Sequence, residues 1–216
     1  MEIIAIALAR VAALVEVQQW DPLGKASSLE AVAKLGSRFR FTKVPVKLEE
    51  LNLQKGLELC EGTLGDIRID RLTIFANGIV IDTRSSTEDS ERVLSEILAL
   101  ANEAFGAKIA PARLTFTSQL IFRSNMQLAA LNPILPKLAG ILTDRVSGDL
   151  KHAFEFQPTA ILLNVDTSQA KTLPAMFSIE RRAEVPFVEN TFFSNAPLRT
   201  REHVELVKAF EDSLIG

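Results

Sequence analysis

Few residues in this chain have side chains suited to catalysis, and the clearest nucleophile is Cys60. It is the single cysteine, and His152 and His203 are the two histidines that could serve as its base. Thiol catalysis needs a thiolate, whereas the carboxylate of the adjacent Glu61 would raise the pKa of the Cys60 thiol. We therefore interpret Cys60 as a small buried hydrophobic residue.

Other catalytic and metal-binding patterns are missing from the sequence. It contains no Gly-x-Ser-x-Gly motif and no phosphate-binding glycine loop. One cysteine and two histidines cannot make a zinc site of the usual kind. Asp66, Asp70 and Asp82 could hold a hard cation, but a solvated strand face is the favoured interpretation. We expect no metal and no cofactor, and the missing motifs favour a protein that is not an enzyme.

A short basic segment near residue 40 has phenylalanines between its charges. Arg38 and Arg40 alternate with Phe39 and Phe41, a mixture that can bind single-stranded nucleic acid. Alternation along an extended segment would send the phenylalanines inward and the arginines outward, onto different surfaces. The net charge of −3 also argues against a nucleic-acid footprint.

The segment 180–198 carries the strongest functional signal. Arg181 shares strand parity with Ile179, so its guanidinium would be buried and would need a carboxylate or an anionic ligand. The chain after Pro186 is expected to be irregular but rich in phenylalanine, which favours either a loop packed on the core or a contact loop. The candidate protein-contact residues are Phe187, Asn190, Phe192, Phe193 and Asn195. The candidate anion-binding residues are Arg38, Arg40, Arg181 and Arg182.

Composition places the chain among ordinary globular proteins. It has 216 residues, of which 47% are hydrophobic and 24% charged. The apolar stretch 3–15 is shorter than the roughly 20 residues of a membrane span, and Glu2 does not suit a signal peptide. With one cysteine, no internal disulfide can form. We expect a cytoplasmic protein without a membrane span.

The clearest structural signals lie between residues 67 and 123. Asn77-Gly78 predicts a type I′ hairpin turn within 67–84 that pairs Ala76 with Ile79. A bulge near Asp70-Arg71 would bring the start of this hairpin into register. Residues 87–105 form an amphipathic helix with Ser85 or Ser86 as cap and Gly106 as its end. Residues 113–123 alternate like a half-buried strand.

The remaining elements follow from periodicity and from glycine and proline. Alanines favour a helix over 3–17, although alternation near its end also allows a strand. We expect further helices over 28–35, 133–146 and 199–214, and extended segments or strands over 38–46, 57–64, 152–157, 159–165 and 175–185.

These elements predict an α+β fold, with helices packed on one face of an antiparallel or mixed sheet. A loose similarity between 67–105 and 175–214 favours two similar sub-domains. Their ranges would be 1–108 and 109–216, with a single domain as the alternative.

Two functions from different classes fit this sequence. The first is a non-catalytic interaction protein, a homo-oligomer or a subunit of an assembly, whose partner is itself or another protein. It depends on the missing catalytic motifs and on the Phe-rich segment. The second is a binding protein or enzyme for a small anionic ligand of the phosphate or nucleotide type, which depends on the four arginines.

Overall fold

A computed structural model describes residues 1–15, 28–106, 110–166, 168 and 173–215. The strands are β1 (Glu2–Leu14), β2 (Leu57–Leu64), β3 (Ile67–Phe75), β4 (Gly78–Thr83), β5 (Arg113–Arg123), β6 (Ala160–Leu163), β7 (Phe177–Arg181) and β8 (Thr191–Ala196). The α-helices are α1 (Ser28–Arg38), α2 (Thr87–Phe105), α3 (Ile134–Leu150) and α4 (Thr200–Ile215). Short 3₁₀ turns are η2 (Leu48–Leu51), η3 (Leu128–Leu131) and η4 (Phe187–Glu189).

The strands form one antiparallel sheet in the order β2-β3-β4-β1-β5-β8-β7-β6. Helices pack on this sheet, so the predicted α+β class is confirmed. The order strand, helix, three strands, helix occurs twice along the chain, once from β1 to α2 and once from β5 to α4. In this repeated order α3 corresponds to α1. The division of the chain into two domains near residue 108 stays a prediction.

The chain separates into two compact units that are each made of several segments. Unit 1 contains residues 1–4, 120–195 and 204–216, and unit 2 contains residues 5–119 and 196–203. Helix α3 and strands β6 to β8 lie almost wholly in unit 1, whereas α1, α2 and β2 to β4 lie in unit 2.

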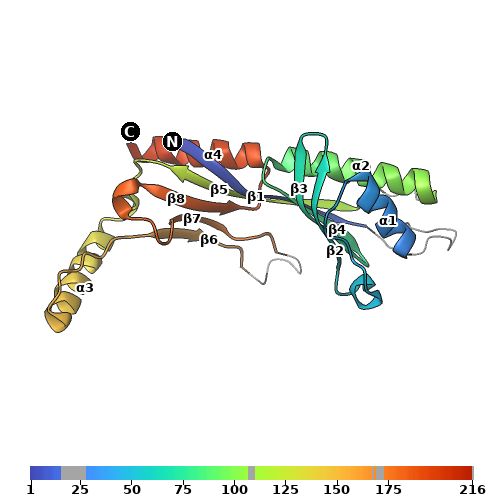
Figure 1. The fold of residues 1–216 in the computed structure, drawn as a ribbon. Helices are drawn as coiled ribbons and strands as arrows, with labels where there is room; N and C mark the ends of the chain where they lie inside the picture. Colours follow the sequence, from blue (N-terminus) through green and yellow to red (C-terminus); the bar gives the residue numbers. More distant parts are fainter. Residues whose placement is uncertain (16–27, 107–109, 167, 169–172, 216) are drawn as a thin grey trace. The chain divides into compact units, whose positions relative to one another are not determined.

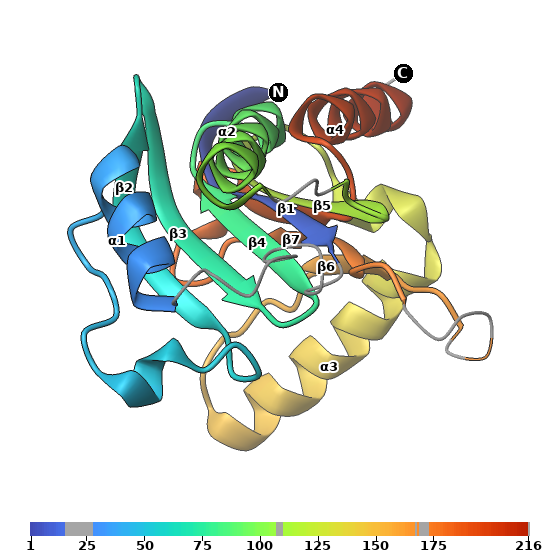
Figure 2. The ribbon, with the colours of Figure 1, turned by 90° about the vertical axis from the view of Figure 1, so that its right-hand side faces the viewer.

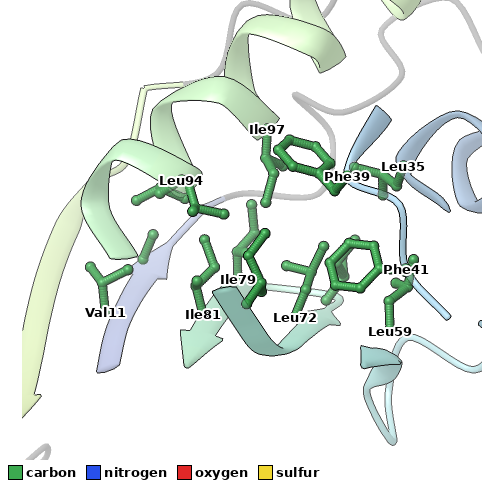
Figure 3. Close-up of a cluster of buried hydrophobic side chains, with 14 of the residues drawn as sticks. Val11, Leu35, Phe39, Phe41, Leu59, Leu72, Ile79, Ile81, Leu94 and Ile97 are labelled. Atoms are coloured by element: carbon green, nitrogen blue, oxygen red, sulfur yellow. The ribbon is translucent and has the colours of Figure 1, made fainter. Parts of the chain in front are cut away.

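The large hydrophobic core lies in unit 2, where α1 and α2 cover one side of their strands (Figure 3). Leu72, Ile79 and Ile81 from the hairpin meet Ile97 of α2 and Phe39 after α1, and all five are at most 1% exposed. Helix α2 lies over β4 (Figure 2). The periodic apolar stripe of α2 therefore packs on the sheet as predicted.

Residues 3–14 form strand β1, so the helix prediction for 3–17 was wrong over this range; residues 16 and 17 lie outside the described residues. Its buried residues Ala9, Val11 and Ala13 recur with period two, which is typical of a strand. Strand order places β1 between β4 and β5. Pairing on both edges outweighs the helix propensity of alanine, because β preference depends mainly on context.

The hairpin is present, but its register differs from the prediction by one residue in each strand. Phe75 pairs with Gly78 and Ile74 with Ile79, so the two-residue turn is Ala76-Asn77. Gly78 lies inside β4, where a Cβ atom would come 2.8 Å from the carbonyl oxygen of Ala13. This glycine therefore allows the close approach of β1 and is not a turn residue.

Several local predictions in this region are confirmed. The register of β3 and β4 shifts between Ile69 and Arg71, at the predicted bulge. The Ser86 side chain accepts a hydrogen bond from the Asp89 N–H at the start of α2, and Gly106 ends that helix in the left-handed conformation with φ 67°. Strand β5 spans the predicted residues 113–123.

Residues 39–46 do not form the predicted strand. Helix α1 continues past Gly36 to Arg38, and Arg40 has a positive φ of 51°. Beyond it the segment makes a single bridge, from Lys43 to Cys60. Phe39 and Phe41 nevertheless point inward, at 0% and 8% exposure, as expected.

The strand prediction over 152–157 was also wrong. The backbone N–H groups of Phe154 and Phe156 donate to the hydroxyls of Ser147 and Thr143 on α3, at 3.0 and 3.1 Å. These two backbone N–H groups therefore do not pair with a neighbouring strand. Conversely, residues 191–196, which the Phe-rich pattern predicted as irregular, form strand β8.

Candidate interaction surface

Helix α3 is the longest element of the described structure that has no buried residue. None of its 17 residues is buried. In Figure 1 it extends away from β6, β7 and β8, the strands of its own unit. A helix that contributes nothing to a core gains little stability from packing, so this arrangement needs an explanation.

Local signals place the start of α3. The Asn132 Oδ1 atom accepts a hydrogen bond from the Ile134 N–H at 2.9 Å, which supports the expected helix start beside Pro133. Pro136 is the third residue of the helix. Its missing N–H lies in the first turn, where no intrahelical acceptor is available, so proline is tolerated there.

One face of α3 holds the segment that leads to β6. Thr143 and Ser147 are half-buried and accept the backbone hydrogen bonds from Phe156 and Phe154. The rings of these phenylalanines stay at the surface, each 40% exposed. The contact between α3 and residues 151–159 therefore satisfies backbone groups but leaves apolar side chains uncovered.

The opposite face of α3 is an uncovered apolar stripe. Ile134, Leu138, Ile141 and Leu142 are 66%, 52%, 52% and 40% exposed. The last three follow Ile134 by four, seven and eight residues, which places all four on one side of the helix. We call these four residues the α3 stripe.

More apolar side chains are exposed near the α3 stripe in sequence. Of the 18 large hydrophobic residues exposed in the described part of the chain, 13 lie between Leu131 and Val188. Strand β6, at the end of the strand order, adds Leu162 and Leu163 at 58% and 61% exposure. This concentration makes the segment the candidate interaction surface, whereas scattered exposed leucines would need no explanation.

Helix α1 shows what the equivalent helix does in the other unit. It buries Val32 and Leu35, at 5% and 6% exposure, against the unit 2 core. Both helices follow the first strand of the repeated order, yet only α1 packs on a core. The apolar surface of α3 is therefore available to a partner.

Arg181 was predicted to be buried with a carboxylate or a ligand as partner. Its guanidinium carbon lies 4.7 Å from the centre of the Phe187 ring and 5.2 Å from that of Phe192. Its Nη1 donates to the Phe187 carbonyl at 3.0 Å, whereas its buried Nε has no hydrogen-bond partner among the described residues. Burial lowers the pKa of this guanidinium. Two rings and a carbonyl thus hold the charge in place of a carboxylate.

The five predicted contact residues occupy different environments. Phe192 is fully buried and stacks on Phe122, with ring centres 5.7 Å apart. Phe193 and Asn195 are half-buried on the other parity of β8, and the Asn195 amide donates to the Met176 carbonyl. Asn190 ends η4 with φ 48°. Phe187 is 41% exposed, so it is the most accessible of the five.

The other three predicted anion-binding residues are divided between the two units. Arg38 pairs with Glu96 at 3.1 Å in unit 2. Arg40 is exposed in the same unit, and Arg182 is exposed in unit 1.

Cys60 and His203 lie several strands apart in unit 2, whereas His152 belongs to unit 1. Cys60 lies on β2, and burial, followed by the charge of Glu58, raises the pKa of its thiol. His203 bonds to the Ser118 carbonyl on β5, four strands further in the sheet order, which corresponds to about 19 Å. His152 is exposed and packs edge-on against Phe154. The raised thiol pKa disfavours a thiolate at Cys60, but the residue is only half-buried, so its interpretation as a buried residue was wrong.

The acidic residues of the hairpin are neutralised by arginines. Asp82 accepts a bidentate pair of bonds from Arg10, at 2.6 and 2.9 Å, and further bonds from Arg71. Asp70 accepts from Arg84 at 2.6 Å. The described residues contain no cluster of three potential metal ligands.

No described helix is both long and apolar enough to cross a bilayer. Comparison with protein families found no matching model, and comparison with curated proteins found no match.

The α3 stripe is the feature that the sequence analysis missed, although the helix itself was predicted. A signal for it exists, because Leu135 and Val146 lie outside the side of α3 that the stripe occupies. A helix with apolar residues on more than one side cannot bury all of them against a single sheet face.

Proposed function

We propose that this chain is a non-catalytic interaction protein that assembles with protein partners through the apolar surface of α3 and β6. The observation that carries the proposal is the α3 stripe, four large apolar side chains on a helix with no buried residue. Exposed apolar faces of this kind mark docking surfaces, and amphipathic helices dock through residues at this spacing.

Two further observations support assembly over catalysis. Cys60 has a raised thiol pKa and lies several strands from His203, and the acidic residues Asp70 and Asp82 of the hairpin pair with arginines. A chain that cannot form an internal disulfide suits a reducing compartment, and the cytoplasm is the proposed location.

Native mass spectrometry of the untagged protein, purified gently from its own cells, tests this proposal. We expect a complex of defined mass for the wild type. The double variant Leu138→Glu with Ile141→Glu should release the partner and leave the fold intact, because both side chains are exposed. Leu206→Glu on α4 is the matched control, since Leu206 is also an exposed apolar helix residue, at 42%. A complex that survives the double variant would overturn the proposal.

A second candidate function is the binding of a small anion by Arg181. The observation behind it is the Nε atom of Arg181, which has no acceptor among the described residues. We expect inorganic phosphate to raise the melting temperature of the wild type and not that of Arg181→Met. If phosphate shifts neither protein, the anion proposal is wrong.

A further inference from the structure

We infer that the partner at the α3 stripe is a second copy of this chain, bound by antiparallel pairing of the two α3 helices. This inference rests on the proposed function, because it names the occupant of the same surface. It is carried by two charges beside the stripe, which can pair across a two-fold axis but not within one α3.

Lys137 and Asp144 lie on the same flank of the α3 stripe. They are seven residues apart, which is nearly two helical turns, so their side chains project in the same direction. The distance along the axis is about 10.5 Å, too long for an ion pair between them. Both are exposed, and neither forms an ion pair within the described part of the chain.

In an antiparallel pair of α3 helices related by a two-fold axis, Lys137 of each copy can face Asp144 of the other. The same flank of both helices meets across the seam of an antiparallel pair. In the register that places Lys137 of one copy opposite Asp144 of the other, the second Lys137–Asp144 pair forms by symmetry. The antiparallel helix dipoles are also favourable in this arrangement.

The same register brings the apolar residues of the two stripes together. Ile141 of both copies lies next to the axis, and Leu138 of each copy lies beside Leu142 of the other. Ile134 then lies over Gly148 of the other copy. A Cβ atom at Gly148 would have no neighbour within 4 Å in the single chain, so its own packing does not require this glycine. A close helix approach does require a small residue at this place.

The charged residues at the end of α3 fit this pairing as well. Arg145 and Asp149 continue the line of the stripe beyond its apolar turns. In this register Arg145 of one copy lies between Ile134 and Leu138 of the other, where its aliphatic part covers them while its guanidinium reaches water. The Lys137–Asp144 pair forms twice in this alignment of the two helices, so we expect it to fix their register.

Charge reversal in the full chain tests this inference. We expect the wild type to be a dimer in sedimentation velocity at 50 mM salt. Lys137→Asp or Asp144→Lys alone creates two like-charge pairs across the axis and should raise the dimer dissociation constant roughly tenfold or more. The variant with both changes restores the pairs and should dimerise like the wild type. Arg84→Asp, a reversal of an exposed charge outside α3, is the control and should not change dimerisation.

Mixing the two single variants gives the sharpest result. One variant then carries two acidic residues on the flank and the other two basic residues. The heterodimer therefore has both ion pairs, and native mass spectrometry should find it in excess over either homodimer. A monomeric wild type at tens of micromolar, or a mixture without heterodimer enrichment, would overturn the inference.

The two proposals can fail separately. One outcome is a wild type that is found with a different protein, and without self-association, while the Leu138→Glu and Ile141→Glu double variant no longer binds that protein. In that case the inferred dimer is wrong and the proposed interaction function stands. If neither a partner nor a second copy is found, both are wrong.

Discussion

Thr87 and Thr200 cap each other's helices, although 113 residues separate them. The backbone N–H of Thr87, at the start of α2, donates to Oγ1 of Thr200 at 3.0 Å. The backbone N–H of Thr200, at the start of α4, donates to Oγ1 of Thr87 at 2.8 Å. Each hydroxyl thus satisfies an amide that has no acceptor in its own helix.

Replacing either threonine with valine should destabilise the fold. Valine keeps the shape of the side chain but removes the acceptor, so one buried N–H of the other helix is left without a hydrogen bond. We expect a loss of about 1–3 kcal/mol in the free energy of unfolding for Thr200→Val, measured by urea denaturation. Thr200→Ser keeps the hydroxyl and serves as the control. A loss as large in the serine variant would show that the methyl group, and not the hydrogen bond, matters.

Local signals made much of the fold predictable from the sequence. Helix α2 was predicted with its cap at Ser86 and its end at Gly106 because both signals act within a few residues. The bulge before Arg71 was predicted from the change of apolar parity along β3. Strand β1 could not be predicted in the same way. Its alanines favour a helix locally, and only pairing with its neighbours in the sheet decides its conformation.

The candidate surface was harder to predict than the elements that form it. Periodicity identified α3 as a helix, but it does not say what a helix packs against. The parity of Arg181 predicted a buried guanidinium, whereas the residue is half-buried and its Nε atom is buried. Its partners, the Phe187 carbonyl and two rings, come from a turn and from β8, which the sequence pattern predicted as irregular. These contacts depend on tertiary pairing that no local pattern records.

Asp82 should contribute more to stability than Asp70, although each pairs with arginine. The Asp82 side chain is 4% exposed and accepts from two arginines, whereas that of Asp70 is 25% exposed and its Arg84 partner is 72% exposed. We expect Asp82→Asn to lower the free energy of unfolding by about 1.5–3 kcal/mol. Asp70→Asn should cost less than about 1 kcal/mol. Urea denaturation of both variants at low and high salt checks this order, and equal losses would contradict it.

Phe192 should act as a core residue of unit 1. Its ring is fully buried and stacks on Phe122, while the neighbouring Phe193 is half-buried on the opposite side of β8. Phe192→Ala removes a ring and leaves a cavity, so we expect a loss of about 3–5 kcal/mol in the free energy of unfolding. Phe193→Ala is the control and should cost clearly less. Thermal denaturation followed by circular dichroism compares the two, and a tolerated Phe192→Ala would contradict the observed packing.

His203 should make the fold sensitive to mild acid. Burial lowers its pKa to about 4, although the hydrogen bond to the Ser118 carbonyl acts in the opposite direction. In the unfolded chain a histidine has its ordinary pKa of about 6.5. Between these two values the unfolded state binds a proton that the folded state does not bind. The stability that depends on neutral His203 is therefore fully present above pH 6.5 and decreases as the pH falls towards 4.

The measurement compares the free energy of unfolding at pH 7.5 and pH 5.0 in the wild type and in His203→Gln. Glutamine can still donate to the Ser118 carbonyl but does not titrate. The carboxylates titrate in the same way in both proteins, so their contributions cancel when the two losses of stability are compared. The wild type should lose about 2 kcal/mol more than the variant over this interval, because pH 5.0 is about 1.5 units below the unfolded pKa. His152→Gln, at an exposed position, should keep the wild-type loss. If His203→Gln and the wild type lose stability equally, His203 takes up its proton over the same pH range in the folded and unfolded states, and burial does not lower its pKa.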